Sequence, residues 1–352
     1  MLLLKLLVCY WEFGVKMKKV KIVLALILLG FVVFIVGCSN SIESSENDIV
    51  LEESNGKEIK VTTDGVKYLV DPSKIVKGVR IPGDVKDAIP SIDNPKYISV
   101  EEADKWIKDN ELVLALTYKN VERVYPLQIL VSHEIVNDFI AGDAILITYC
   151  PLCGSGIAYE RTINGEVVEF GTSGKLYNSN LVMYDRKTES YWTQIDGDAI
   201  VGELTGMELK EISIDTVAWR DWKKLHKDSE VLSRDTGYAK SYGSNPYGGY
   251  FEDDFIWFPL ENEDTSNRIR PKDVVFGIEI DGKSIAYTEN SIISSNGLIE
   301  DTFNGVNIKV ERSEDGIVKI TNLDSGEEII KERDFWFAWF AFHPESKLYG
   351  FD

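Results

Sequence analysis

Short runs of aliphatic, β-branched and aromatic residues recur along the chain, with Gly, Asn and Asp between them. Such runs fit the pleated, half-buried surface of a sheet, and the residues between them favour turns, so the pattern predicts β-strands. The strands that we expect are residues 144–149, 157–160, 167–170, 181–184, 274–280, 306–310, 317–320 and 335–342. Their number favours a fold dominated by antiparallel sheet.

Apolar residues three or four positions apart predict helices in fewer places. These segments are residues 100–108, 126–138 and 215–226. In the second segment, Pro126 stands where the first helical turn tolerates proline, and His133 and Asn137 would share one face of the helix. The whole pattern predicts an α+β fold, predominantly antiparallel β with a few helices. No internal repeat is evident, and the strand order stays open.

The N-terminal region has a long apolar stretch behind a basic start. Met17 opens a Lys-rich sequence, residues 22–36 are apolar, and Gly37-Cys38 follows. This order is typical of a bacterial secretory signal whose cysteine receives a lipid. We expect a signal peptide over residues 1–37, with translation starting at Met17, and a lipid on Cys38 that anchors the protein to the extracytoplasmic side of the cell membrane. The alternative is a retained helix, since a stretch of this length could span a bilayer.

The remainder of the chain divides by composition. Residues 38–58 are rich in Ser, Asn and Glu and bury too little apolar surface to order themselves, so we expect a flexible acidic tether after the lipidated cysteine. Residues 59–352 are rich in aromatic side chains and predict a single globular domain. The formal net charge of −20 at pH 7 argues against a nucleic-acid partner, because such a surface repels phosphates.

The candidate chemistry centres on a pair of cysteines, Cys150-Pro-Leu-Cys153, directly after the apolar residues 144–149. In a redox pair, one thiolate attacks and the other resolves, and the attacking thiol needs a lowered pKa. A thioredoxin fold supplies that with a helix N-terminus after the cysteines. Here a glycine-rich turn and a strand-like run follow, which predicts a fold that is not thioredoxin-like.

Two other interpretations of the cysteine pair remain open. Cys150 and Cys153 could bind copper or zinc together with His133, with Met183 as a further ligand suited to copper(I). Alternatively, the pair could form a structural disulfide across a tight turn, which would stabilise the fold little because the closed loop is so short.

The hydroxyl- and amide-rich sequence downstream of the cysteines predicts a polar pocket. It does not match a phosphate-binding loop, because the spacing G-x-x-x-x-G-K-[ST] is absent. The candidate pocket residues are Ser173, Lys175, Asn178, Asp185 and Arg186. Asp185 and Arg186 could equally form an ion pair at the end of a strand.

Several long motifs carry a family resemblance. They are YPLQILVSHEIVND, TYCPLCGSGIAYER, FGTSGKLYNSNLVMYDRKTESYWTQ, SYGSNPYGGY and WFAFHPE, in this order, between about residues 80 and 345. With them the chain resembles the bacterial and archaeal family called domain of unknown function 3179. The resemblance implies secretion, usually as a lipoprotein or signal-bearing protein, and a motif centred on Cys150 and Cys153. It implies no particular activity.

Our leading hypothesis from the sequence is a membrane-anchored protein of thiol redox chemistry, a thiol oxidoreductase. Cys153 would attack, since small residues leave its side open, Cys150 would resolve, and His133 would be a nearby base or orienting donor. The redox partner or small substrate stays unknown. The alternatives are a lipoprotein that binds copper or zinc through the same three residues, and a non-catalytic surface module with a structural disulfide. A close approach of His133 to the sulfurs would support the first two hypotheses.

Overall fold

The computed structural model describes residues 49–54, 57–79 and 81–351. The predicted signal peptide, the start at Met17, the lipidation site Cys38 and part of the predicted tether lie outside the described residues. Residues 50–352 form one compact unit. No helix in the described part of the chain is both long and apolar enough to cross a membrane.

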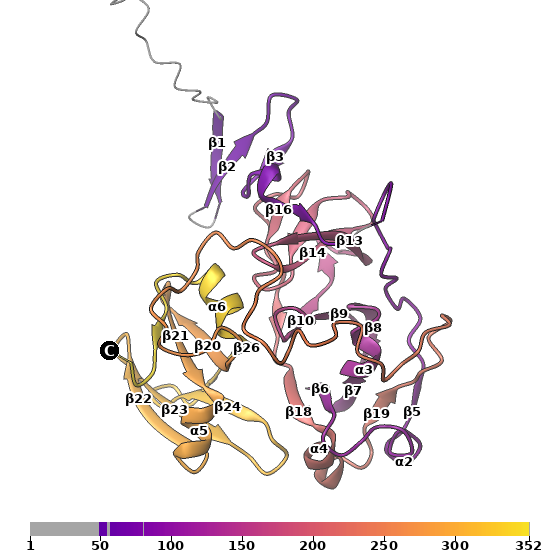
Figure 1. The fold of residues 1–352 in the computed structure, drawn as a ribbon, viewed down its shortest axis with the longest axis vertical. Coiled ribbons are helices and arrows are strands. Elements are labelled where there is room, and N and C mark those ends of the chain that lie inside the picture. The colour runs from indigo at the N-terminus through magenta and orange to yellow at the C-terminus, as the bar shows by residue number, and fades with distance from the viewer. Residues whose placement is uncertain (1–48, 55–56, 80, 352) are drawn as a thin grey trace, which may run out of the picture. The chain divides into compact units, whose positions relative to one another are not determined.

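The predicted dominance of antiparallel sheet is confirmed (Figure 1). The described strand pairs are antiparallel except β7 with β19 and β21 with β27. The largest sheet has the order β1 (Ile49–Ser54), β2 (Lys57–Val61), β3 (Lys67–Tyr68), β16 (Ala199–Val201), β15 (Tyr191–Thr193), β14 (Asn180–Asp185), β13 (Phe170–Tyr177) and β4 (Val76–Lys77).

The cysteines belong to a second sheet at the centre of the unit. Its order is β17 (Glu211–Ile212), β10 (Ser155–Glu160), β9 (Asp143–Cys150) and β8 (Ile135–Ile140). A third sheet has the order β18 (Asp215–Ala218), β6 (Leu112–Tyr118), β7 (Val121–Pro126), β19 (Glu230–Leu232) and β5 (Tyr97–Ser99). The short hairpin of β11 (Thr162–Ile163) and β12 (Glu166–Val167) follows β10.

The C-terminal part adds two more sheets. One has the order β26 (Glu332–Phe335), β20 (Val274–Ile280), β21 (Lys283–Thr288) and β27 (Lys347–Leu348). The other has the order β22 (Leu298–Phe303), β23 (Val306–Arg312), β24 (Val318–Asn322) and β25 (Glu328–Ile329). The helices of the described residues are short: η1 (Pro72–Lys74), α2 (Val100–Ala103), α3 (Leu127–Leu130), α4 (Trp219–Leu225), α5 (Glu289–Ser294) and α6 (Trp336–Phe342).

The predicted helix over residues 126–138 is wrong beyond its first turn. The structure has α3 and then the strand β8, which pairs with β9 from Ile135 opposite Thr148. Glu134 between them has a φ of 61°, which turns the chain out of the helix. His133 and Asn137 therefore do not share a helix face.

Other expected elements also change. Residues 167–170, expected as one strand, are the end of β12, two residues without regular structure and the start of β13. The expected helix over residues 100–108 ends at Ala103, and that over 215–226 is the strand β18 followed by α4. The expected strand over 335–342 is the end of β26 followed by α6, five of whose residues are buried. An apolar run buried all round has no period that separates strand from helix, so sequence pattern could not decide this case.

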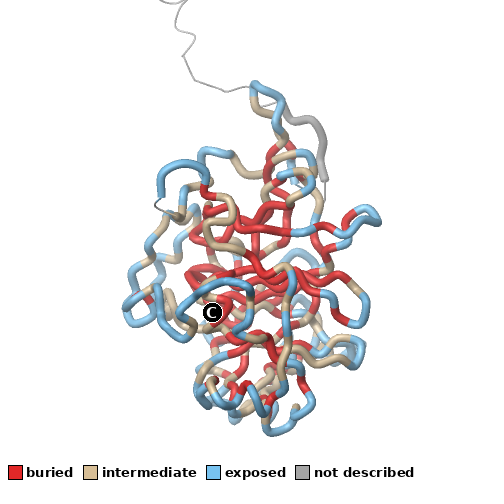
Figure 2. Tube along the Cα trace, turned by 90° about the vertical axis from the view of Figure 1, so that its right-hand side faces the viewer, coloured by how far each residue is buried: buried red, intermediate tan, exposed pale blue. Residues whose placement is uncertain are grey.

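Residues 233–273 form no helix or strand, yet they cover the sheet that carries the cysteines. In Figure 1 this segment, coloured orange, runs past β8, β9 and β10 towards α6. Figure 2 shows the buried residues concentrated along the central strands. The core cluster there contains both cysteines together with Leu152, Phe170 and Trp192. The cysteine pair is thus enclosed by parts of the chain that are far apart in sequence.

Candidate functional site

The two cysteines lie in the tight turn between β9 and β10. Cys150 and Ser155 pair across this hairpin, and the backbone N–H of Cys153 donates to the carbonyl oxygen of Cys150 over 3.2 Å. Gly154 completes the turn with a φ of 66°. A β-turn closed in this way brings its first and last Cα atoms within about 7 Å, the separation that a disulfide can bridge.

Both cysteines are free thiols and both are buried. Their sulfurs approach the same atom, the carbonyl oxygen of Ser179, at 4.0 Å from Cys150 and 3.5 Å from Cys153. Ser179 stands in the two-residue loop between β13 and β14, where it and Asn178 have positive φ values, as in the tight turns that suit a hairpin. The next residue, Asn180, donates its side-chain N–H to the Cys153 sulfur over 3.5 Å.

The surroundings distinguish the two thiols. Burial, and next the hydrogen bond with Cys150, raises the pKa of the Cys153 thiol well above its ordinary value. Cys153 is 0% exposed and Cys150 is 2% exposed. A thiol with a raised pKa holds little thiolate at neutral pH and is a weak nucleophile. Cys153 is therefore poorly suited to make the first attack on a substrate.

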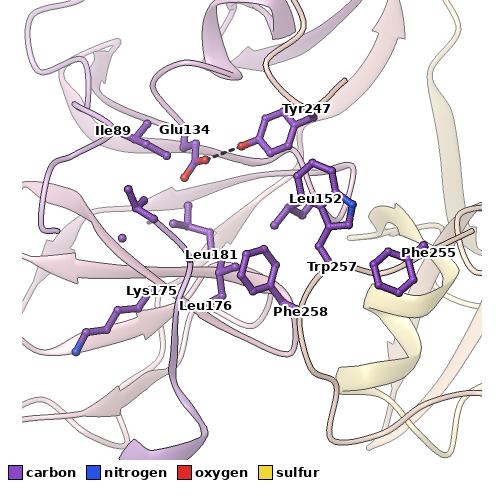
Figure 3. Close-up of a pocket in the computed structure, with 13 residues that line it drawn as sticks. Ile89, Glu134, Leu152, Lys175, Leu176, Leu181, Tyr247, Phe255, Trp257 and Phe258 are labelled. Carbon is purple, nitrogen blue, oxygen red and sulfur yellow. Dashed lines mark hydrogen bonds between the residues drawn. The ribbon is translucent and has the colours of Figure 1, made fainter. Parts of the chain in front are cut away.

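A cavity of about 570 Å³ lies against the cysteine turn (Figure 3). Leu152, from within the turn, forms part of its wall. Other walls come from β13 and β14 and from the irregular segment 233–273, which contributes aromatic rings. The lining residues are Gly78, Val79, Ile89, Glu134, Leu152, Gly174, Lys175, Leu176, Leu181, Tyr247, Phe255, Trp257 and Phe258. The lining is mainly apolar, as is usual for a small-molecule site.

Glu134 is the one carboxyl group in the lining of this cavity. Its side chain is directed towards Tyr247, whose hydroxyl donates to Glu134 Oε1 over 3.3 Å (Figure 3). Burial raises the pKa of Glu134 to about 7, and the hydrogen bond from Tyr247 partly opposes that rise. A carboxyl group with a pKa near neutrality can both accept and donate a proton.

Glu134 is also linked to the cysteines. Its carbonyl oxygen accepts the N–H of Tyr149, the residue before Cys150, over 2.8 Å. Burial and then the negative charge of Glu134 raise the pKa of Tyr247, whose hydroxyl lies 3.3 Å from Glu134 Oε1. Sequence reasoning missed Glu134 in favour of its neighbour His133. The signal that could have identified it is a single carboxyl group within the apolar sequence LVSHEIV.

His133 has other partners than the cysteines. Its Nδ1 is 2.7 Å from the carbonyl oxygen of Pro90, and its Nε2 is 2.6 Å from the hydroxyl oxygen of Tyr242. The imidazole is completely buried, and burial lowers its pKa. Since each ring nitrogen is hydrogen-bonded to an oxygen atom, neither nitrogen of His133 is free to bond to a cysteine sulfur in this arrangement.

The predicted metal ligands are not brought together. Met183 is buried in β14, opposite Thr172 and Trp192. Within residues 49–54, 57–79 and 81–351, no group of three or more His, Cys, Asp or Glu side chains is arranged to hold a metal ion. The sequence-based copper or zinc site through Cys150, Cys153, His133 and Met183 thus gains no support.

The predicted polar pocket residues divide between different places. Lys175 lines the 570 Å³ cavity, and Asn178 lines another cavity of about 560 Å³. Ser173 is buried and donates to the carbonyl oxygen of Val182.

Asp185 and Arg186 have structural partners at the end of β14. Asp185 is buried and accepts the indole N–H of Trp192 over 3.0 Å. Arg186 pairs with Asp93 at 2.7 Å and with Glu169 at 3.2 Å. These contacts bind the end of β14 to residues that precede and follow it in the sequence. They account for both side chains as structural residues.

Comparison with known proteins identifies a family but no characterised relative. The family model described as "Protein of unknown function (DUF3179)" matches residues 86–324, more than half of the chain. The match includes the cysteine turn, Glu134 and the segment 233–273. No curated protein matches the chain, and no solved structure matches it.

Proposed function

This chain belongs to the DUF3179 family, whose function is unknown, and we propose that it is a thiol oxidoreductase that exchanges its dithiol with a substrate disulfide. The observation that carries the proposal is the pair of free thiols in one β-turn beside an apolar cavity. The turn holds the sulfurs close enough to form a disulfide without rearrangement of the sheet.

Cys150 makes the first attack in the proposed reaction, in place of Cys153, which the sequence had favoured. Its thiol gives its proton to Glu134, and the thiolate attacks one sulfur of the substrate disulfide, which forms a mixed disulfide and releases one substrate thiolate. Cys153 then loses its proton, attacks the Cys150 sulfur, and releases the second substrate thiolate. The protein loses two electrons and the substrate gains them.

The cavity indicates the kind of substrate. Its aromatic and aliphatic walls favour a disulfide flanked by apolar groups, and its volume of about 570 Å³ suits a small molecule or a short peptide segment. Leu152, from the cysteine turn, and Tyr247 both line the cavity. Because Tyr247 belongs to a segment without helix or strand, a small displacement there would open the way to Cys150.

The test is thiol oxidation of the full-length protein in detergent. We expect wild-type protein, purified anaerobically, to reduce 4,4′-dithiodipyridine and to release two equivalents of thiopyridone in excess of those released by a Cys150→Ser/Cys153→Ser variant. The double variant sets the background because the chain also contains Cys9 and Cys38. Cys153→Ser should stop at the mixed disulfide and release one equivalent. Wild-type protein that releases no more than the double variant would refute the proposal.

Anchoring at the membrane is part of the proposal and rests on the sequence around Cys38. An apolar stretch that ends in Gly37-Cys38 supports a lipid anchor on the extracytoplasmic side. We expect cells that express the protein to incorporate labelled palmitate into it, and Cys38→Ser to abolish incorporation. Equal labelling of the two forms would contradict a lipid on this residue.

A further inference from the structure

A second, polar cavity is lined by Tyr159 of β10 and by Glu332 of β26. Its volume is about 510 Å³, and it is enclosed by residues of β10, β17, β20 and β26 and by the turn after β15. Six carboxyl groups are among its lining residues: Asp196, Asp198, Glu208, Glu211, Glu279 and Glu332. Burial and neighbouring carboxylates raise the pKa of three of them, Asp196, Glu211 and Glu332.

Asp334 lies in β26, two residues after Glu332, which lines the polar cavity. The next residue, Phe335, donates its backbone N–H to the carbonyl oxygen of Cys153 over 2.8 Å, which fixes β26 against the turn (Figure 1). The Asp334 side chain is 0% exposed, and neither of its carboxylate oxygens has a hydrogen-bond partner among the described residues. Ser155 and Glu332 both lower the pKa of Asp334, and the charge of Asp334 raises the pKa of the Cys153 thiol.

A buried carboxyl group without partners is costly, and folded proteins contain few of them. Replacement of such a group by an apolar residue would be expected to stabilise the fold, so its presence calls for another reason. The reaction proposed above supplies one, because Cys153 is completely buried and its proton must leave through the protein.

We propose that Asp334 accepts the thiol proton of Cys153 and that Glu332 and the carboxyl groups of the polar cavity conduct this proton to solvent. The inference rests on the proposed thiol redox function and adds the proton path to it. In this step the Cys153 S–H bond breaks and an O–H bond forms on Asp334. The Cys153 thiolate then attacks the Cys150 sulfur of the mixed disulfide, and the second substrate thiolate leaves with the electron pair of the broken S–S bond.

Neither the Ser179 carbonyl oxygen nor the Asn180 amide, which both contact the Cys153 sulfur, can take up the proton. Asn180 donates an N–H to the sulfur and another to Gln194 Oε1, and Gln194 in turn donates to Thr148 at 3.0 Å and to Ser155 at 3.4 Å. Neutral amide groups are not bases at physiological pH. Asn180 is therefore a positioning residue that stabilises a thiolate on Cys153, while Asp334 is the nearby group that can accept a proton.

The electrostatics along the path agree with this role. Burial raises the pKa of Asp334 to about 7, against the opposing charge of Arg333. Burial and neighbouring carboxylates raise the pKa of Glu211 to about 8 and that of Asp196 to about 7. The pKa of Glu332 is raised well above its ordinary value by burial and then by the charges of Asp334, Glu211 and Asp196.

Cations and one histidine also face this carboxyl cluster. The positive charge of Lys331 opposes the rise in pKa at Glu211, and that of Lys57 opposes it at Asp196. His343 lies 4.0 Å from Asp196, and burial lowers its pKa to about 4, so it stays neutral while the carboxyl groups titrate. Groups with pKa values near neutrality can pass a proton on because none of them binds it tightly.

The experiment follows the two releases of thiopyridone from 4,4′-dithiodipyridine by stopped flow, with full-length protein in detergent. We expect Asp334→Asn to slow the second release by about 100-fold, the usual effect of losing a base, and to leave the first release unchanged. In wild-type protein the rate of the second release should rise with pH through about 7, where Asp334 loses its proton. The variant should lose this rise.

Two further variants make the outcome decisive. Glu332→Gln should slow the second release as well, and it carries the test if Asp334→Asn does not fold. Asp301→Asn, which removes a carboxylate that binds Tyr287 in another sheet, is the matched control and should behave like wild type. Normal second releases with an unchanged pH dependence in both path variants would overturn the proton path. Wild-type protein without any release would instead overturn the thiol redox function itself.

Discussion

The hydroxyl of Tyr247 donates to Glu134 Oε1 over 3.3 Å and so joins the irregular segment 233–273 to the start of the cysteine-bearing sheet. The two residues are 113 positions apart in sequence. Both residues line the apolar cavity together with Leu152 of the cysteine turn. Several consequences of this contact can be measured.

Tyr247→Phe removes one hydrogen bond and leaves the ring in place. Because the bond from Tyr247 lowers the pKa of Glu134, we expect this pKa to rise above its value of about 7 in the variant. The free energy of unfolding should fall by about 1 kcal/mol, the usual net value of a hydrogen bond. NMR titration of the Glu134 carboxyl carbon and urea unfolding measure the two effects. An unchanged pKa would show that the contact is absent in solution.

Glu134 makes the fold less stable as the pH rises. Its pKa is about 7 in the folded protein against 4.5 for the free group, so the folded state binds the proton more tightly than the unfolded state. The resulting stabilisation is complete below pH about 4.5 and is lost as the pH rises through about 7, with a total of about 3 kcal/mol.

Glu134→Gln separates this contribution from that of buried Asp334, whose raised pKa gives a pH dependence of the same sign. As the pH rises from 5 to 8, the free energy of unfolding measured with urea should fall by about 3 kcal/mol less in the variant than in wild type. Exposed Glu300 provides the control, and Glu300→Gln should follow the wild-type profile. Identical profiles for Glu134→Gln and wild type would contradict a raised pKa.

Gly154 tests how tightly the cysteine turn is packed. A Cβ atom at this position would lie 3.0 Å from the ring of Phe335, and the φ of 66° is one that only glycine adopts easily. Gly154→Ala should therefore destabilise the fold by more than the roughly 1 kcal/mol of backbone strain alone. The matched control is Gly165→Ala, where φ is 81° but no atom lies within 4 Å. Equal losses in thermal unfolding would show that Phe335 does not press on the turn.

His133 should prove to be a structural residue. With both ring nitrogens bonded to oxygen atoms inside the protein, His133→Gln should reduce the free energy of unfolding by about 1–3 kcal/mol. The rate of thiol oxidation should not change. A loss of oxidation rate at unchanged stability would restore the base role that the sequence predicted.

The lowered pKa of His133 makes the free energy of unfolding depend on pH with a sign opposite to the dependence that Glu134 causes. The folded state binds this proton less tightly than the unfolded state, so stability is lost as the pH falls below about 6.5, where the unfolded histidine takes up a proton. We expect His133→Gln to weaken the acid-side loss of stability in urea unfolding between pH 7 and pH 5. An unchanged acid-side slope would contradict the burial of a neutral imidazole.

The strands around the cysteines could be predicted because their signal is local. Residues 144–149 form the body of β9 and residues 181–184 lie within β14, as their β-branched and aliphatic content indicated. The pair Cys150 and Cys153 at the end of a buried strand was likewise visible from adjacent residues alone.

The segments that were predicted wrongly depend on distant partners. The apolar spacing in residues 126–138 fits a helix, but pairing with β9 draws Ile135–Ile140 into the strand β8. Residues 336–342 form α6, and all of them are apolar, so there is no polar face to reveal a helical period.

By itself, the sequence determined the sheet-rich fold class and the place of the cysteine pair, since both depend on the order of neighbouring side chains. Only the tertiary structure decided which groups surround the sulfurs. Tyr247 is bonded to Glu134 in the cavity wall, and β26 is bonded to the cysteine turn through the backbone N–H of Phe335. Burial by segments far apart in sequence also sets the pKa values of Glu134 and Asp334, and no local pattern carries that information.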